Sequence, residues 1–176
     1  VEEYCRHMHP ERNFKFVKVS SYDPMTTGPA TSLRECREFL QRPFIMVASD
    51  IYINQKEIGL CDSNWLSSHE TEIPEIYATL QVDGKNVTAI KDKSSSGYGL
   101  AWTGIMSVFD YENFWMSFKD QDKEVPDVIS RSIGSMTYEH RSIDWYDLGT
   151  YDSYVIAKRL LEKESKFVIP KSNYET

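Results

Sequence analysis

The chain has 176 residues, of which 40% are hydrophobic and 13% aromatic, values that are typical of a globular protein and exclude a disordered or fibrous one. Its formal net charge of -7 disfavours broad electrostatic binding to nucleic acid or to an anionic membrane, because an acidic surface is repelled by both. Any phosphate chemistry must therefore depend on a few local cations or on a metal ion.

The first predicted elements are a strand, a helix and a second strand. Residues 14–19 alternate between apolar and lysine side chains, which predicts a short strand. Ser32 and Glu35 have the spacing of a capping box, and apolar residues then recur at helical spacing as far as Leu40, so we expect a helix here. Residues 43–48 form a continuous apolar run that is typical of a central parallel strand buried on both faces.

A strand, a helix and a buried strand in this order indicate an α/β protein. We expect a mostly parallel open sheet with helices on both faces, which is a Rossmann-like arrangement. Ligands of such sheets bind in crevices at the carboxyl ends of the strands. Ser49 and Asp50 directly follow the buried run, so Asp50 is expected to lie where a ligand binds.

The remaining elements follow from local patterns. Residues 76–82 and 86–90 flank Asp83-Gly84, a favoured tight-turn pair, and predict a hairpin. We expect one further strand and three helices, at residues 100–109, 111–118, 125–133 and 151–164. No linker or repeat divides these elements, so the sequence predicts one domain over residues 1–165, with residues 166–176 as a tail or the start of a following domain.

Asp147 directly precedes the last predicted helix. Gly149 frees the backbone to approach a ligand closely, and Thr150 can cap the helix. A turn and a helix cap explain the same pattern without any ligand, since acidic residues are common before helices.

The cysteines point to a reducing compartment. Cys5, Cys36 and Cys61 have neither paired spacing nor an even number, which argues against a disulfide framework or a zinc ribbon. No apolar run approaches the roughly 20 residues that span a bilayer, and the first residues lack a signal-peptide pattern. We therefore expect a cytoplasmic protein without a membrane span.

Four segments resemble, in the same order, motifs of the sugar-phosphate and phosphocholine nucleotidyltransferases. Residues 28–33 resemble the turn that contacts the nucleotide, and residues 44–50 the strand that ends in the first metal aspartate. Residues 101–105 resemble the glycine-containing strand that lines the acceptor pocket. Residues 145–154 resemble the late tryptophan, aspartate, glycine, threonine signature, whose aspartate binds magnesium. The resemblance covers nearly all of the chain.

The resemblance implies a set of site residues. Asp50 and Asp147 are the expected Mg²⁺ ligands and catalytic residues, and Lys93 is expected to hold the phosphate of the acceptor. The alternative for Lys93 is a solvated loop lysine. The nucleotide is expected to contact Gly28, Pro29, Ala30 and Ser49, and the acceptor to contact Asp92, Lys93, Trp102, Gly104 and Trp145.

The implied reaction is the transfer of a nucleotidyl group from a nucleoside triphosphate, with CTP favoured, to a sugar phosphate or a phosphocholine-like acceptor. Pyrophosphate is released, and the expected role is surface-polysaccharide (capsule) biosynthesis. The family's glycine-rich, arginine-containing triphosphate loop has no counterpart in these residues, so we expect a partial nucleotidyltransferase domain, which further domains of a longer chain could follow. The alternative is a non-catalytic module that binds a nucleotide sugar or a partner protein.

Overall fold

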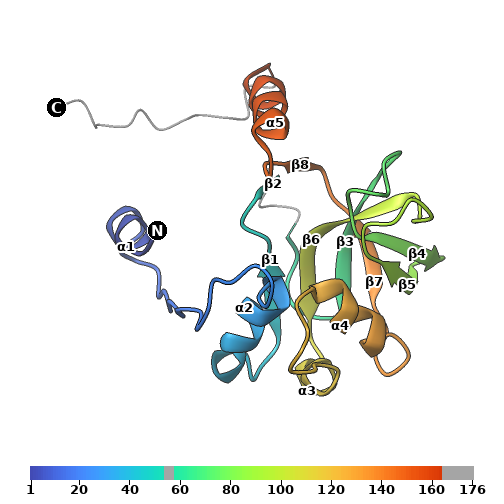
Figure 1. The fold of residues 1–176 in the computed structure, drawn as a ribbon. Helices are drawn as coiled ribbons and strands as arrows, with labels where there is room; N and C mark the ends of the chain where they lie inside the picture. Colours follow the sequence, from blue (N-terminus) through green and yellow to red (C-terminus); the bar gives the residue numbers. More distant parts are fainter. Residues whose placement is uncertain (54–57, 164–176) are drawn as a thin grey trace.

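The computed structural model describes residues 1–53 and 58–163 (Figure 1). The elements in chain order are α1 (Glu2–Met8), α2 (Pro29–Glu35), the 3-10 helix η1 (Arg37–Phe39), β1 (Phe44–Val47), β2 (Ile51–Ile53), β3 (Trp65–Glu70), β4 (Thr79–Asp83), β5 (Asn86–Lys91), β6 (Leu100–Val108), α3 (Tyr111–Met116), α4 (Val125–Ser132), β7 (Glu139–Ser142), β8 (Trp145–Asp147) and α5 (Tyr151–Lys163). The predicted tail at residues 166–176 lies outside the described residues. None of the described helices is long and apolar enough to cross a bilayer.

Six strands form one mixed sheet in the order β1-β6-β3-β7-β5-β4. Strand β4 also pairs with β6, so the sheet curls into a small barrel-like closure. Among the described strands only β3 and β7 run parallel, and the other pairs are antiparallel. The α/β class is confirmed, but the expected mostly parallel open sheet is not what these residues form. Parallel neighbours need crossover connections, whereas the tight turn between β4 and β5 makes an antiparallel pair.

Strand β1 is also placed differently from the prediction. It pairs antiparallel with β6 and has no second neighbour among the described strands, so it is not a central parallel strand. Phe44 packs against Phe114 and Trp115, while Ile45 packs on the opposite side against the cluster that contains Trp65. Both faces are therefore covered, which explains the continuous apolar run. Val47, the last residue of the strand, is 46% exposed.

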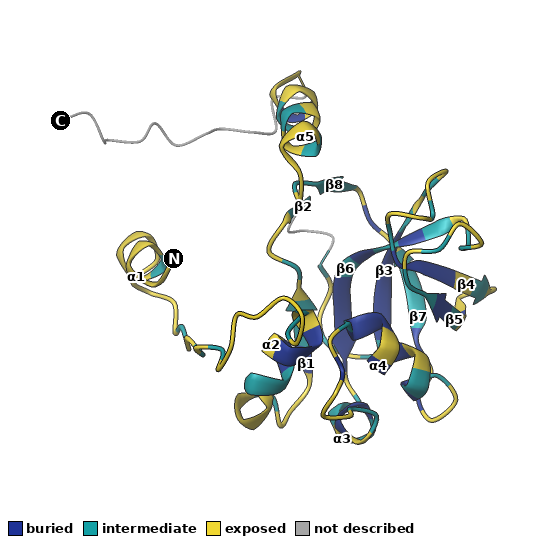
Figure 2. Ribbon diagram, in the orientation of Figure 1, coloured by how far each residue is buried: buried dark blue, intermediate teal, exposed yellow. Residues whose placement is uncertain are grey.

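The core lies mainly between the sheet and α2, α3 and α4, as the buried residues in Figure 2 show. A smaller cluster of Trp65, Ile105 and Ile143 packs on β3 and β6. Burying each large aliphatic or aromatic side chain stabilises the fold by about 1.5–3 kcal/mol. These two clusters fix the strands from which the site residues project.

Helix α2 begins earlier than the predicted capping box. Gly28 occupies the N-cap and Pro29 the first turn, where its missing N–H costs no hydrogen bond. Ser32 therefore lies inside the helix, and Glu35 accepts a hydrogen bond from Ser20 Oγ at 2.7 Å. The α-helix ends at Glu35, and the 3-10 helix η1 follows after Cys36.

The predicted strand at residues 14–19 is wrong. These residues are irregular and belong to an arm that leads from α1 to α2 (Figure 1). No residue of α1 is buried. Alternation alone does not make a strand, because its backbone N–H and C=O groups need a neighbouring strand, and none of the described strands pairs with this arm.

The locally encoded elements are confirmed. The hairpin turns at Gly84, whose φ of +57° is the left-handed conformation that glycine favours. Strand β6 and helices α3, α4 and α5 lie where they were predicted. Thr150 caps α5 as expected: Ser153 N donates to Thr150 Oγ1 at 3.1 Å, and Thr150 N donates to Ser153 Oγ at 3.0 Å.

Candidate functional site

A short two-stranded ribbon brings Asp50 and Asp147 together. Strands β2 and β8 pair antiparallel, with Ile51 opposite Asp147. The backbone N–H of Leu148 then donates to the carbonyl oxygen of Asp50 at 2.8 Å. The two acidic residues, far apart in the sequence, therefore occupy the same end of the ribbon.

Gly149 leaves open the space between the two carboxylates. A Cβ atom at this position would lie 3.1 Å from Asp147 Oδ1 and 3.3 Å from Asp50 Oδ2. The N–H of Gly149 donates to Asp147 Oδ1 at 2.8 Å. Both carboxylates thus face one point that carries no side chain.

Two carboxylates fit the requirements of a magnesium site. Mg²⁺ is usually held by one or two carboxylates, with waters and substrate phosphates completing its coordination. Within residues 1–53 and 58–163, no group of three or more histidine, cysteine, aspartate or glutamate side chains could hold a metal ion. The arrangement therefore suits a cation that arrives with a phosphorylated ligand better than a closed structural site.

Beside the carboxylates lies a cavity of about 390 Å³. Its volume is within the range of about 300–1,000 Å³ that small-molecule pockets occupy. Eight of the predicted site residues line it: Pro29, Asp50, Asp92, Lys93, Trp102, Gly104, Trp145 and Asp147. The structure thus gathers the expected metal and acceptor residues around one cavity.

Three predicted nucleotide-binding residues do not line this cavity. Ala30 is fully buried, and its N–H donates to Lys123 O at 2.8 Å. Gly28 packs on the same backbone, since a Cβ there would lie 2.5 Å from Lys123 O. Ser49 is exposed beside Asp50. Of the turn at residues 28–30, only Pro29 faces the cavity.

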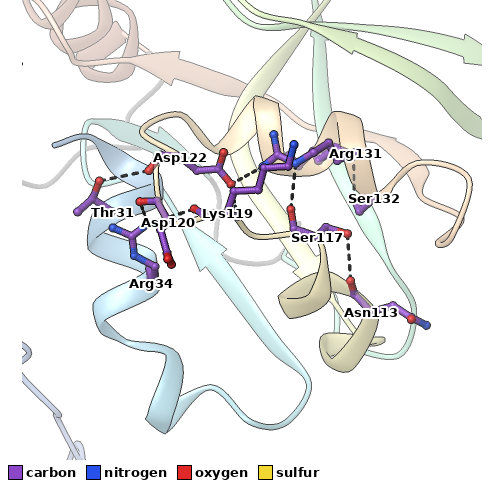
Figure 3. A network of polar contacts seen from close by, with 10 residues as sticks. Thr31, Arg34, Asn113, Ser117, Lys119, Asp120, Asp122, Arg131 and Ser132 are labelled. Carbon is purple, nitrogen blue, oxygen red and sulfur yellow. Dashed lines mark hydrogen bonds and ion pairs between the residues drawn. The ribbon is translucent and has the colours of Figure 1, made fainter. Parts of the chain in front are cut away.

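A polar network holds this turn in place (Figure 3). The buried carboxylate of Asp122 accepts a hydrogen bond from Lys119 N at 2.7 Å and forms an ion pair with Arg131 of α4. Thr31 of α2 donates to the carbonyl oxygen of Asp122, and Arg34 donates to that of Lys119. The network fixes the loop before α4 against α2. Together these two segments form one wall of the cavity.

The side of the cavity that carries the predicted acceptor-binding residues has specific backbone geometry. Gly104 has φ of +82°, and a Cβ there would lie 2.8 Å from Ala48 Cβ. Trp102 is anchored by its Nε1, which donates to Ile105 O at 2.9 Å. Lys93 is exposed, has φ of +30°, and is the only cation among the described residues that line the cavity.

Among the lining residues that were not predicted as site residues, Tyr77 and Glu124 carry titratable side chains. The hydroxyl of Tyr77 donates to Asp147 Oδ2 at 3.4 Å, and burial followed by the nearby Asp147 charge raises the pKa of Tyr77. Glu124 precedes α4 as Asp147 precedes α5, and this shared pattern of an acid before a helix could have indicated it. Nothing local marks Tyr77, because its contact to Asp147 is long-range.

No protein-family model and no curated protein sequence matches the chain. Solved structures do match. Apo UDP-glucose pyrophosphorylase superposes with a TM-score of 0.71 at 12% identity, over 93% of this chain and 70% of that one. A Bacillus anthracis structure described as a glucose-1-phosphate thymidylyltransferase gives a TM-score of 0.65 at 19% identity, over 86% of this chain and 65% of that one. The chain has the nucleotidyltransferase fold.

A third structure with this fold is the inositol-1-phosphate CTP transferase of T. maritima, with a TM-score of 0.64 at 15% identity. It is matched over 82% of this chain and 64% of its own length. The chain thus spans about two thirds of the length of each of these structures. The likeness confirms, at the level of the fold, the resemblance that the four motifs indicated.

Proposed function

We propose that the chain carries the metal-binding and acceptor-binding part of a nucleotidyltransferase. The reaction transfers a nucleotidyl group from a nucleoside triphosphate to a phosphorylated small molecule and releases pyrophosphate. The observation that carries the proposal is the convergence of Asp50 and Asp147 on the open point at Gly149, beside the cavity. The nucleotidyltransferase fold supports it.

The residues have distinct roles in this reaction. Asp50 and Asp147 hold Mg²⁺, which supplies charge neutralisation at the α-phosphate and the leaving pyrophosphate when bound. Lys93 holds the phosphate of the acceptor as a point cation. An oxygen of that phosphate forms the new bond to the α-phosphorus while the bond to the pyrophosphate breaks, so no general base is required. Positioning by the cavity walls supplies much of the rate.

The finer features of the proposal depend on the motif resemblance. We take CTP as the donor, and a sugar phosphate or a phosphocholine-like compound as the acceptor. The product would serve surface-polysaccharide biosynthesis in the cytoplasm. The cavity of about 390 Å³ accommodates either acceptor.

A non-catalytic binding module is the second candidate, and the charge of the cavity favours it. The described lining residues include Asp50, Asp92, Glu124 and Asp147 but only one cation, Lys93. A triphosphate carries more negative charge than the diphosphate of a nucleotide sugar, so this acidic lining disfavours a triphosphate more strongly. A module of this kind would bind a nucleotide-linked metabolite or a partner protein without turnover.

Pyrophosphate release distinguishes the two candidates. The full-length protein is incubated with Mg²⁺, each of the four nucleoside triphosphates, and a panel of hexose 1-phosphates and phosphocholine. We expect release with one pair of substrates, and a loss of about 100-fold in Asp50→Asn and in Asp147→Asn. Asp127→Asn, an exposed position on α4, is the matched control and should retain the full rate. If the two site variants also retain it, the metal assignment is wrong; binding of a nucleotide sugar without release supports the module.

A further inference from the structure

Tyr77 lies two residues before β4 and contacts both Asp147, a proposed metal ligand, and Lys93, the proposed phosphate-binding residue. Its hydroxyl donates to Asp147 Oδ2 at 3.4 Å. Its ring meets Trp145 edge to face, with centroids 5.2 Å apart and an interplanar angle of 77°. Its carbonyl oxygen accepts a hydrogen bond from Lys93 N at 3.2 Å. One residue therefore contacts both β8 and the loop after β5.

The hydroxyl of Tyr77 completes the support of the Asp147 carboxylate. Gly149 N donates to Oδ1 and Tyr77 to Oδ2, so each oxygen has one protein donor. An ionised carboxylate offers about four lone-pair positions, which leaves acceptor capacity on both oxygens for a cation. The terminal torsion of an aspartate is broad when nothing restrains it. A donor on each oxygen restrains that torsion and aims the carboxylate toward Asp50.

The backbone carbonyl of Tyr77 also restrains Lys93. Lys93 has φ of +30°, a strained conformation for a non-glycine residue that persists only where neighbouring structure imposes it. The hydrogen bond from Lys93 N to the carbonyl oxygen of Tyr77 is part of that structure.

We infer that Tyr77 is a positioning residue of the candidate site, whose hydroxyl fixes the Asp147 carboxylate for a divalent cation. The inference rests on the proposed function, because it takes Asp147 as a metal ligand. Groups that hydrogen-bond to a metal ligand typically change metal affinity or activity by 10–100-fold when they are removed. The long hydrogen bond of Tyr77 places the expected effect at the lower end of this range.

Tyr77→Phe tests the inference, with Mn²⁺ as the probe and the electron paramagnetic resonance signal of free Mn²⁺ as the readout. Phenylalanine removes the hydroxyl and keeps the ring on Trp145. We expect the Kd for Mn²⁺ to rise about tenfold, while the unfolding midpoint and the near-ultraviolet circular dichroism of the tryptophans stay unchanged. Tyr111→Phe is the matched control: its hydroxyl contacts Glu112 at 3.5 Å, away from the cavity, and its Kd should equal that of the unsubstituted protein.

A Kd for Tyr77→Phe within about threefold of the unsubstituted protein overturns the inference. A weaker Kd that comes with a lower unfolding midpoint also overturns it, since the residue is then merely structural. Asp147→Asn separates these failures from that of the proposed function. If Asp147→Asn binds Mn²⁺ unchanged, the metal site itself is wrong; if it loses binding and Tyr77→Phe does not, only the role of Tyr77 is wrong.

Discussion

Substituting Gly149 by alanine should impair the metal site without unfolding the protein. The φ of Gly149 is not in the left-handed region, so its backbone accepts an L-residue. The new Cβ would lie 3.1 Å from Asp147 Oδ1 and 3.3 Å from Asp50 Oδ2, which is closer than ordinary van der Waals contact. The two carboxylates must move by a few tenths of an ångström, and a methyl group then occupies the space that they face.

The expected magnitudes differ between binding and stability. A misplacement of about 1 Å in a site can cost 10²-fold, so the smaller displacement here should weaken Mn²⁺ binding by at least about tenfold, or about 1.4 kcal/mol. A glycine-to-alanine change at an acceptable backbone conformation stabilises a protein by about 0.4–1 kcal/mol through the unfolded chain, and the crowding offsets part of this. The free energy of unfolding should therefore stay within about 1 kcal/mol of its original value.

The assay combines an Mn²⁺ titration with urea unfolding of the same samples. Gly99→Ala is the matched control, because a Cβ at Gly99 meets nothing within 4 Å and its φ also lies outside the left-handed region. It should leave the Mn²⁺ affinity unchanged and raise the free energy of unfolding by about 0.4–1 kcal/mol. Equal Mn²⁺ affinities in Gly149→Ala and Gly99→Ala would refute the convergence of the two carboxylates on Gly149.

Three further predictions concern stability. Asp122→Asn removes the charged partner of Arg131 in a buried ion pair and should lower the free energy of unfolding by about 2–3 kcal/mol in a urea titration. This value lies at or below the lower end for such pairs, because the Arg131 side chain is 29% exposed. A loss no greater than that of Asp127→Asn would contradict the prediction. Gly104→Ala combines a left-handed φ with a clash on Ala48 and should cost more than Gly84→Ala, which has only the φ penalty; equal losses would argue against the close packing of β6 on Ala48. Burial raises the pKa of Tyr138, so its stabilising contribution is complete below about pH 10 and is lost above it, by up to about 1.4 kcal/mol per pH unit. Tyr138→Phe should flatten that alkaline loss in urea unfolding, and an unaltered pH slope would count against this cause.

Features encoded by neighbouring residues could be predicted from the sequence. The Asp83-Gly84 pair specifies its hairpin, because glycine takes the left-handed conformation that the turn needs. Thr150 caps α5 through Ser153, three residues along the chain. In both cases the interacting groups lie within one turn of each other, so the local pattern contains the whole interaction.

Features that depend on distant pairing could not be predicted. The β2–β8 ribbon has three residues on each strand, too few to show a period, yet it is what joins Asp50 to Asp147. The motif resemblance implied that the two acids share a metal ion, but no local residue pattern shows their proximity or the ribbon that produces it. Tyr77 was missed for the same reason, since its contact with Asp147 spans 70 positions of the sequence.

The continuous apolar run before Asp50 was misinterpreted for a different reason. Apolar residues on both faces of a strand indicate that both faces are covered, and β1 meets that condition with one strand neighbour among the described residues. The pattern reports burial and not the direction of the neighbouring strand. The placement of Asp50 after the strand survived the error, because it depends only on where β1 ends.

The most direct test of the central claim is an anomalous difference map from crystals of the protein grown with Mn²⁺. We expect a single anomalous peak in the cavity, within coordination distance of both Asp50 and Asp147 and beside Gly149. A peak elsewhere in the cavity, or none at this position at a concentration that saturates binding in solution, would contradict it.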